Sequence, residues 1–331
     1  MTQSTIESIA KAIAPELRTL NERIFLALSS SNQMMNGIVK DYLQKKGKQI
    51  RPVVVILSAK LFSEKITQKT IAAAAAVEML HNASLIHDDV IDESEMRRNE
   101  PTVNGIWDNH IAVLVGDFFT STSLQLANET ADLRVLSTMA ALGRRLAMGE
   151  LDQIYNARYH RLNEDAYMHT IEQKTASLFI ACAEMGAFAA GIEDSDPRLQ
   201  ALRKFACNFG LCFQITDDIF DYFPCESEIG KPAGNDLREG KVTLPLLSVL
   251  LQNDAPHTKE MLALIAKENL NSDEINRLMQ YAIANGGIEY AQQKMKQLAS
   301  EATNILCEAF PESEARKALI DLLAYILQRS K

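Results

Sequence analysis

Apolar residues recur every three or four positions along most of the chain, the spacing that places them on one face of a helix. From residue 6 to 28 they stand at Ile6, Ile9, Ile13, Leu17, Leu20, Ile24 and Leu28. We expect one helix there, and further helices over residues 34–43, 68–92, 111–128, 133–155, 164–190, 199–223, 244–251, 259–267, 272–284, 288–310 and 312–328. Alternating patterns typical of strands are nearly absent. The pattern therefore predicts an all-α, bundle-like fold with its site in the bundle core.

An acidic stretch ends the helix expected over residues 68–92. Asp88 and Asp92 are four positions apart and Asp89 and Asp92 are three apart, so the carboxylates gather on one helical face. Like charges at this spacing destabilise a helix by roughly 0.2–0.5 kcal/mol per pair, which suggests that a cation offsets them. Oxygen ligands without cysteine favour Mg²⁺, usually held by one or two carboxylates plus substrate phosphates. For this motif alone, a solvated acidic patch is the alternative.

The same spacing returns later in the chain, where Asp217, Asp218 and Asp221 again follow an apolar helical face. The repetition makes a solvated patch the poorer interpretation. Two carboxylate-bearing helices that face each other across a cavity could hold several Mg²⁺ ions, and such a cluster needs a polyanion such as diphosphate. Because the two motifs make sense only together, we expect a single domain over residues 1–331.

Basic residues stand at positions suited to anion binding. Lys48 and Arg51 lie where one predicted helix stops and the next begins. Helix N-termini attract anions, and arginine can bind a phosphate in a bidentate manner. An ordinary basic loop is the alternative. The turn-rich residues 224–236 carry Lys231 just after the second acid motif, and we interpret them as a candidate lid.

Composition narrows the class of protein. With 47% hydrophobic residues, a chain of 331 residues has ample material for a core. A net charge of −9 argues against nucleic acid as a partner, because phosphate backbones recruit basic surfaces. Five cysteines, without zinc-type spacing, are typical of reduced thiols in a cytoplasmic protein. We expect no signal peptide, because the N-terminus lacks a basic-then-apolar pattern. We expect no transmembrane segment, because polar side chains interrupt the most apolar stretch, residues 71–86.

Taken together, the motifs resemble those of the trans-prenyl diphosphate synthases, the polyprenyl synthetase family. They are Gly47-Lys-x-x-Arg51, Glu78-Met-Leu-His81, Asp88-Asp-x-x-Asp92 with Arg97-Arg98, Lys174-Thr175, Phe213-Gln-x-x-Asp-Asp-x-x-Asp221 and Gly230-Lys…Lys241. The resemblance spans nearly the whole chain and is greatest to bacterial long-chain members such as octaprenyl diphosphate synthase. It implies a single large bundle of antiparallel helices around a deep central cavity (the isoprenoid synthase type), a homodimer and Mg²⁺ as cofactor.

The resemblance also implies roles for individual residues. The diphosphate of isopentenyl diphosphate would be held by Lys48, Arg51, His81 and Arg98. The allylic diphosphate, farnesyl or similar, would be held by Arg97, Lys174, Thr175, Gln214, Lys231 and Lys241. The principal metal ligands would be Asp88, Asp92 and Asp217, supported by Asp89, Asp218 and Asp221. Catalysis would rest on Asp88, Asp92, Asp217, Lys174 and Lys231.

Other functions stay open. A farnesyl or geranylgeranyl diphosphate synthase would share every motif. A terpene cyclase would need the acid motifs but no second diphosphate site, hence neither Lys48, Arg51 nor His81. A head-to-head condensing enzyme of the squalene type is a further alternative. The non-catalytic subunit of a two-part synthase, a binding protein rather than an enzyme, commonly lacks acid motifs that this chain keeps.

Product length is expected to depend on the residues one helical turn before the first acid motif. Ser84 and Ala83 lie four and five positions before Asp88, roughly 6–7.5 Å deeper along the helix. A bulky aromatic there would act as a floor, whereas these small residues leave the tunnel open; close helix packing is the alternative. The deeper floor would come from Phe118, Phe119 or Leu124. We expect a product in the heptaprenyl to nonaprenyl range, with octaprenyl favoured, that serves as a precursor of quinone side chains. Whether product release needs transient contact with a membrane stays open.

Overall fold

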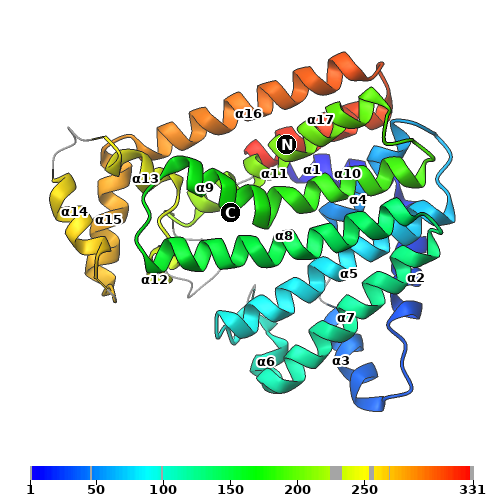
Figure 1. The fold of residues 1–331 in the computed structure, drawn as a ribbon, viewed down its shortest axis with the longest axis horizontal. Helices are drawn as coiled ribbons and strands as arrows, with labels where there is room; N and C mark the ends of the chain where they lie inside the picture. The colour runs from blue at the N-terminus through cyan, green and yellow to red at the C-terminus, as the bar shows by residue number, and fades with distance from the viewer. Residues whose placement is uncertain are drawn as a thin grey trace. The chain divides into compact units, whose positions relative to one another are not determined.

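The computed structural model describes residues 2–44, 47–97, 100–223, 233–252, 257–267 and 269–328, with side chains from Ile6 onward. The helices are α1 (Thr2–Ala12), α2 (Ala14–Ala27), α3 (Gln33–Gln44), α4 (Ile50–Lys60), α5 (Gln68–Ile91), α6 (Val103–Ile106), α7 (Asn109–Glu129), α8 (Leu133–Arg158), α9 (Glu164–Ile171), α10 (Ser177–Ala189), α11 (Pro197–Phe220), α12 (Asn235–Arg238), α13 (Leu244–Leu250), α14 (Thr258–Ile265), α15 (Ser272–Ala284), α16 (Gly287–Ala309) and α17 (Glu314–Gln328). Two short strands, β1 (Met96–Arg97) and β2 (Glu100–Pro101), pair antiparallel. The all-α prediction is confirmed (Figure 1).

Two of the expected helices were wrong in detail, each for a local reason. The helix expected over residues 6–28 is two helices, because Pro15 lacks an N–H and starts α2 afresh. The helix expected over residues 164–190 is interrupted by a π-helical turn at Glu172–Ala176. The helix expected over residues 272–284 is α15, whose N-cap, Asn271, forms a capping box with Glu274.

The Cα positions group into two compact units, which are described separately. The first contains residues 1–144, 178–204 and 305–322, and the second contains residues 145–177, 205–304 and 323–331. Several long helices contribute residues to both. A single domain over residues 1–331 stays a prediction.

Helix α5 is the centre of the first unit. Its alanine run, Ala72 to Ala76, is buried, and α7, α4 and α2 pack against it (Figure 1). Small side chains let neighbouring helices approach closely. Gly116 of α7 lies directly against the His87 ring, where a Cβ atom would clash. This contact brings α7 beside the last turns of α5, which carry the first acid motif.

The second unit is held together by contacts between distant segments. Glu164 at the start of α9 accepts hydrogen bonds from Tyr290 (2.7 Å) and Lys294 (2.8 Å) of α16. On α11, the hydroxyl of Thr216 is 3.0 Å from the Met295 sulfur.

Among the described residues, no helix is long and apolar enough to cross a membrane.

Candidate active site

The first acid motif occupies the C-terminal end of α5, and its three aspartates have different surroundings. Asp89 is buried, only 6% exposed, and its Oδ1 accepts a 2.7 Å hydrogen bond from Nε of Arg97. Asp88 is half-buried, and Asp92, which follows the last residue of the helix, is exposed. Buried charges require a partner, which Arg97 supplies. Asp89 therefore serves the protein's own contacts, while Asp88 and Asp92 remain accessible to solvent.

The basic loop leads into α4 in the same unit. Gln49, the N-cap residue of α4, adopts a left-handed conformation (φ 49°), and Lys48 before it is exposed. Arg51 lies in the first turn of α4, half-buried, with its guanidinium 5.4 Å from the centre of the Phe179 ring. This stacking and the turn after Gln49 fix where the guanidinium lies.

Two residues of the motifs named above, Glu78 and His81, lie on α5, and His81 is expected to bind the same diphosphate as Arg51. Arg51 and Glu78 both lie close enough to the sulfur of Cys182 to affect its pKa. Burial raises the pKa of this thiol, the positive charge of Arg51 lowers it, and the negative charge of Glu78 raises it further. His81, one turn after Glu78, is half-buried on α5. Arg98 lies outside the described residues.

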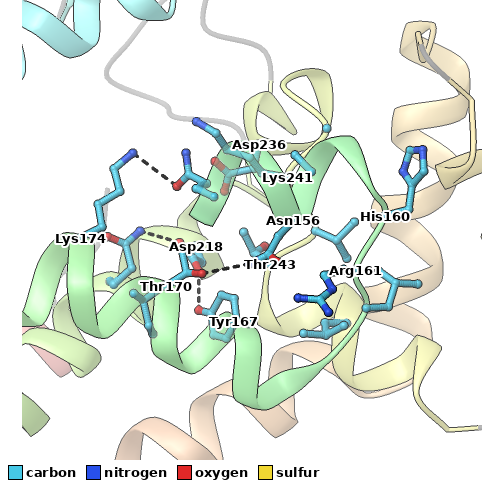
Figure 2. A pocket seen from close by; sticks show the side chains of 18 of the residues that line it. Asn156, His160, Arg161, Tyr167, Thr170, Lys174, Asp218, Asp236, Lys241 and Thr243 are labelled. Carbon is cyan, nitrogen blue, oxygen red and sulfur yellow. Dashed lines mark hydrogen bonds between the residues drawn. The ribbon is translucent and has the colours of Figure 1, made fainter. Parts of the chain in front are cut away.

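The second acid motif occupies the end of α11 and shows the same division between a buried aspartate and an accessible neighbour. Asp218 is 3% exposed, while Asp217 is exposed. The Tyr167 hydroxyl donates to Oδ2 of Asp218 (2.5 Å; Figure 2). Nε2 of Gln214 donates to Oδ1 of the same carboxylate (2.7 Å). Thr175 in turn donates to the Gln214 side-chain oxygen (2.6 Å). The motif is thus tied to α9 and to the π-helical turn.

Burial dominates the electrostatics of Asp218. It raises the pKa of this carboxyl to about 7, although the hydrogen bonds from Tyr167 and Gln214 oppose the rise. The negative charges of Asp217 and Asp221 add to it. A cation beside these carboxylates would relieve the repulsion, which is the electrostatic condition that favours metal binding.

Lys174 reaches this region from the π-helical turn. Its ammonium pairs with Glu150 and lies 3.3 Å from Oε1 of Gln153, both on α8. A Cβ atom at Gly149 would lie 2.8 Å from the backbone nitrogen of Lys174, so only glycine allows α8 this close to the turn. π-Helical turns are frequent at functional sites. Thr175 of this turn donates to Gln214, whereas the Lys174 ammonium extends toward α8; both residues line the same cavity as Asp218.

The second unit contains a cavity of about 180 Å³, which is lined in part by Tyr167 and Asp218. Its lining includes four of the predicted substrate residues: Lys174, Thr175, Gln214 and Lys241. The Lys241 ammonium bonds to Glu239 (2.5 Å). Lys231 lies outside the described residues. Lys174 and Lys241, like Arg97 of the first unit, therefore pair with carboxylates of the protein.

The carboxylates do not form a ready-made metal cage. Within the described ranges, no group of three or more His, Cys, Asp or Glu side chains is placed to hold a metal ion. The donor chemistry nevertheless suits a hard cation, because both motifs offer carboxylate oxygens, and Asp92 and Asp217 are exposed.

Comparisons with known proteins agree with the site's chemistry. Residues 32–282 match the family model for polyprenyl synthetase. The chain belongs to the polyprenyl synthetase family. It is 34% identical to the octaprenyl diphosphate synthase of Haemophilus influenzae, over 97% of this chain and 96% of that one. It is 32% identical to component 2 of the heptaprenyl diphosphate synthase of Geobacillus stearothermophilus, over 98% of this chain and 99% of that one.

Solved structures of the polyprenyl synthetase family share its fold. A decaprenyl diphosphate synthase from Rhodobacter capsulatus is 31% identical with a TM-score of 0.90, over 98% of this chain and 99% of that one. A polyprenyl synthase from Caulobacter crescentus, solved with calcium and isoprenyl diphosphate, is 31% identical with a TM-score of 0.89, over 98% of each chain. The protein is a prenyltransferase of the trans-prenyl diphosphate synthase type.

The sequence analysis missed two residues that shape the second motif, Tyr167 and Gly149. Tyr167 precedes Lys174 by seven positions, two helical turns, so it lies on nearly the same face as that lysine. That spacing could have marked it. Nothing in the sequence around Gly149 shows that α8 touches a π-helical turn there.

Proposed function

We propose that this polyprenyl synthetase is a long-chain enzyme, which adds isopentenyl diphosphate repeatedly to an allylic primer such as farnesyl diphosphate. Octaprenyl diphosphate is the favoured product, because the octaprenyl diphosphate synthase of Haemophilus influenzae and the heptaprenyl component of Geobacillus stearothermophilus are among its relatives. The observation that carries the proposal is the pair of small residues one turn before the first acid motif. Ala83 and Ser84 place no aromatic ring beneath Asp88.

The predicted floor residues differ in burial. Phe119 of α7 is fully buried and packs edge-on against Tyr42, with ring centres 5.3 Å apart. Leu124 is 41% exposed, which makes it a poor candidate for the end of an enclosed tunnel. Phe118 is half-buried. Of the three, we propose Phe119 as the residue that limits chain length, because it is fully buried and packs against Tyr42.

Divalent cations would be held by Asp88, Asp92 and Asp217, whose carboxylates are at least partly accessible to solvent. Mg²⁺ is proposed from the oxygen-only donor set and the expected diphosphate. When bound, it would neutralise negative charge on the leaving diphosphate. Asp89 and Asp218 support the motifs through their bonds to Arg97 and Tyr167.

Basic side chains would bind the two diphosphates. Lys48, Arg51, His81 and Arg98 are assigned to isopentenyl diphosphate, and Arg97, Lys174, Thr175, Gln214, Lys231 and Lys241 to the allylic diphosphate. Lys174 and Lys241 already have carboxylate partners, which would hold their ammonium groups near the cavity until a diphosphate competes for them.

The reaction follows from these charges. The allylic C–O bond breaks with its electron pair going to the diphosphate, whose growing charge the lysines stabilise. The alkene electrons of isopentenyl diphosphate form the new C–C bond to the allylic carbon. Loss of a proton to the released diphosphate restores an alkene. Exclusion of water from the cavity prevents capture of the allylic cation as an alcohol.

A homodimer is proposed as the working assembly. Helix α7 exposes Val113, Leu114 and Leu124, and exposed apolar side chains that share a helical face mark association surfaces. Cytoplasmic location, and membrane contact during product release, remain predictions. The relative named as component 2 of a heptaprenyl diphosphate synthase makes a two-part enzyme the competing arrangement.

The deciding experiment incubates the purified chain alone with Mg²⁺, labelled isopentenyl diphosphate and farnesyl diphosphate. Chromatography of the dephosphorylated products is expected to show a C35 to C45 prenyl alcohol, C40 predominant. A farnesyl or geranylgeranyl product would refute the long-chain assignment. Activity only after a second chain is added would establish the two-part arrangement.

Ser84→Phe tests the tunnel. Ser84 is half-buried, so a ring there should shorten the product toward geranylgeranyl while the protein stays folded. Ala83→Phe is less clean because Ala83 is 1% exposed, and overpacking a buried site typically costs about 1–3 kcal/mol. An unchanged product length from a folded Ser84→Phe enzyme would remove the basis of the length assignment.

A further inference from the structure

Asp221, the last aspartate of the second motif, binds the backbone of a segment more than ten residues further on. Its Oδ1 accepts the backbone N–H of Asn235 (3.0 Å), and its Oδ2 accepts that of Asp236 (3.0 Å). Its own carbonyl oxygen accepts the backbone N–H of Gly234 (2.8 Å). Three consecutive amides are therefore satisfied by one residue.

The bound segment is also held by packing. Gly234 has a left-handed backbone (φ 80°), and a Cβ atom there would meet the Ile275 and Met279 side chains. Leu237 in the following turn is buried, 5% exposed. The segment therefore has one location, set by apolar contacts on one side and by Asp221 on the other.

The same segment places Lys241. The backbone N–H of Lys241 donates to the carbonyl oxygen of Asp236 (2.7 Å), which closes the turn after α12. Asp236 and Lys241 both line the cavity that contains Lys174 and Asp218, and Figure 2 shows them beside each other. A continuous path of hydrogen bonds thus runs from Asp221 through Asp236 to the backbone of Lys241.

We propose that Asp221 is a positioning residue that docks residues 234–241 against the end of α11 and thereby places Lys241, rather than a ligand of the metal ions. Each of its carboxylate oxygens accepts one N–H donor, and hydrogen bonds to a charged acceptor are about twice as strong as neutral ones. A rotation of the side chain that turned these oxygens away from residues 235 and 236 to face a metal ion would leave two amides without an acceptor. This changes the supporting metal role expected from the motif.

The contribution of Lys241 to allylic diphosphate binding rests on the proposed function, but the docking itself does not. Amide hydrogen exchange of the protein without metal or substrate reports directly on Asn235 and Asp236. In Asp221→Asn, which loses the charge and one acceptor oxygen, at least one of these two amides is expected to exchange ten times faster or more. Asp221→Glu, which keeps both oxygens, should recover part of the protection.

Asp217→Asn is the matched control, because Asp217 is one turn earlier on α11 and exposed. It should leave exchange at the two amides within twofold of wild type. In turnover assays, Asp217→Asn should raise the Mg²⁺ concentration for half-maximal rate or abolish turnover. Asp221→Asn should instead raise KM for the allylic substrate several-fold, with the Mg²⁺ dependence unchanged.

Two results would overturn the proposal: exchange of both amides within twofold of wild type in Asp221→Asn, or an Mg²⁺ requirement raised as much as in Asp217→Asn. A wild-type protein that does not turn over prenyl diphosphates would refute the proposed function. In that case, exchange at residues 235 and 236 still decides whether Asp221 docks the segment.

Discussion

Tyr167→Phe removes the hydroxyl that donates to Asp218 of the second motif and leaves the ring in place. Among the described residues, the hydroxyl of Tyr167 and the amide of Gln214 both donate to Asp218, and Tyr167 and Asp218 are buried, 8% and 3% exposed. Hydrogen bonds to charged groups contribute about 1.5–3 kcal/mol. Because Gln214 still donates to the other carboxylate oxygen, we expect the free energy of unfolding to fall by about 2 kcal/mol.

The loss should be measurable in the protein without metal. For a chain of 331 residues, the entropy of unfolding is about 0.7 kcal/mol/K, so about 2 kcal/mol corresponds to a Tm lower by roughly 3 °C. Urea unfolding followed by circular dichroism at pH 8.5, where a carboxyl of pKa about 7 is ionised, gives the free energy directly. Tyr159→Phe is the control, because Tyr159 is 60% exposed and should change stability by less than about 0.5 kcal/mol.

A double-mutant cycle identifies the partner. If Tyr167 acts through Asp218, the effects of Tyr167→Phe and Asp218→Asn should be non-additive by about 1 kcal/mol or more. Additive effects, or a Tyr167→Phe protein as stable as wild type, would show that the 2.5 Å contact contributes nothing to the folded state.

Three further predictions concern packing, pH and metal. Gly149→Ala would place a Cβ atom 2.8 Å from the Lys174 backbone nitrogen. Urea unfolding should show a free energy of unfolding lower by about 1–3 kcal/mol, and kinetics should show a higher KM for the allylic substrate. Unchanged values of both would refute the close contact. Burial opposes a low pKa of Glu164, but hydrogen bonds from Lys294 and Tyr290 outweigh it and lower the pKa below 4.5. The stabilisation from ionised Glu164 is present above pH 4.5 and is lost as the pH falls through the lowered pKa. In Glu164→Gln the urea midpoint should therefore decline less steeply at acid pH than in wild type. An identical decline in the two proteins would contradict this role of Glu164. Dialysis against EDTA should abolish turnover and Mg²⁺ should restore it, whereas full activity in excess chelator would refute the metal proposal.

From the sequence alone, helical periodicity predicted the all-α fold, and the resemblance of the motifs to those of a known family indicated the family. Both are local properties: an apolar face needs only a repeat of three or four residues, and paired aspartates need only adjacent turns. The same reasoning failed at the π-helical turn, Glu172–Ala176, because the inserted residue changes the period without changing composition.

Tertiary structure decided what each aspartate does. The sequence presents Asp217, Asp218 and Asp221 as equivalent carboxylates, yet one is exposed, one is buried beneath Tyr167, and one accepts the amides of residues 235 and 236. Their partners are separated from them by many positions along the chain, and no spacing rule encodes such contacts. The motif therefore indicates carboxylate chemistry, but only the folded chain gives each of the three side chains its role. The reason is that burial and hydrogen-bond partners depend on which distant segments pack against the end of the helix.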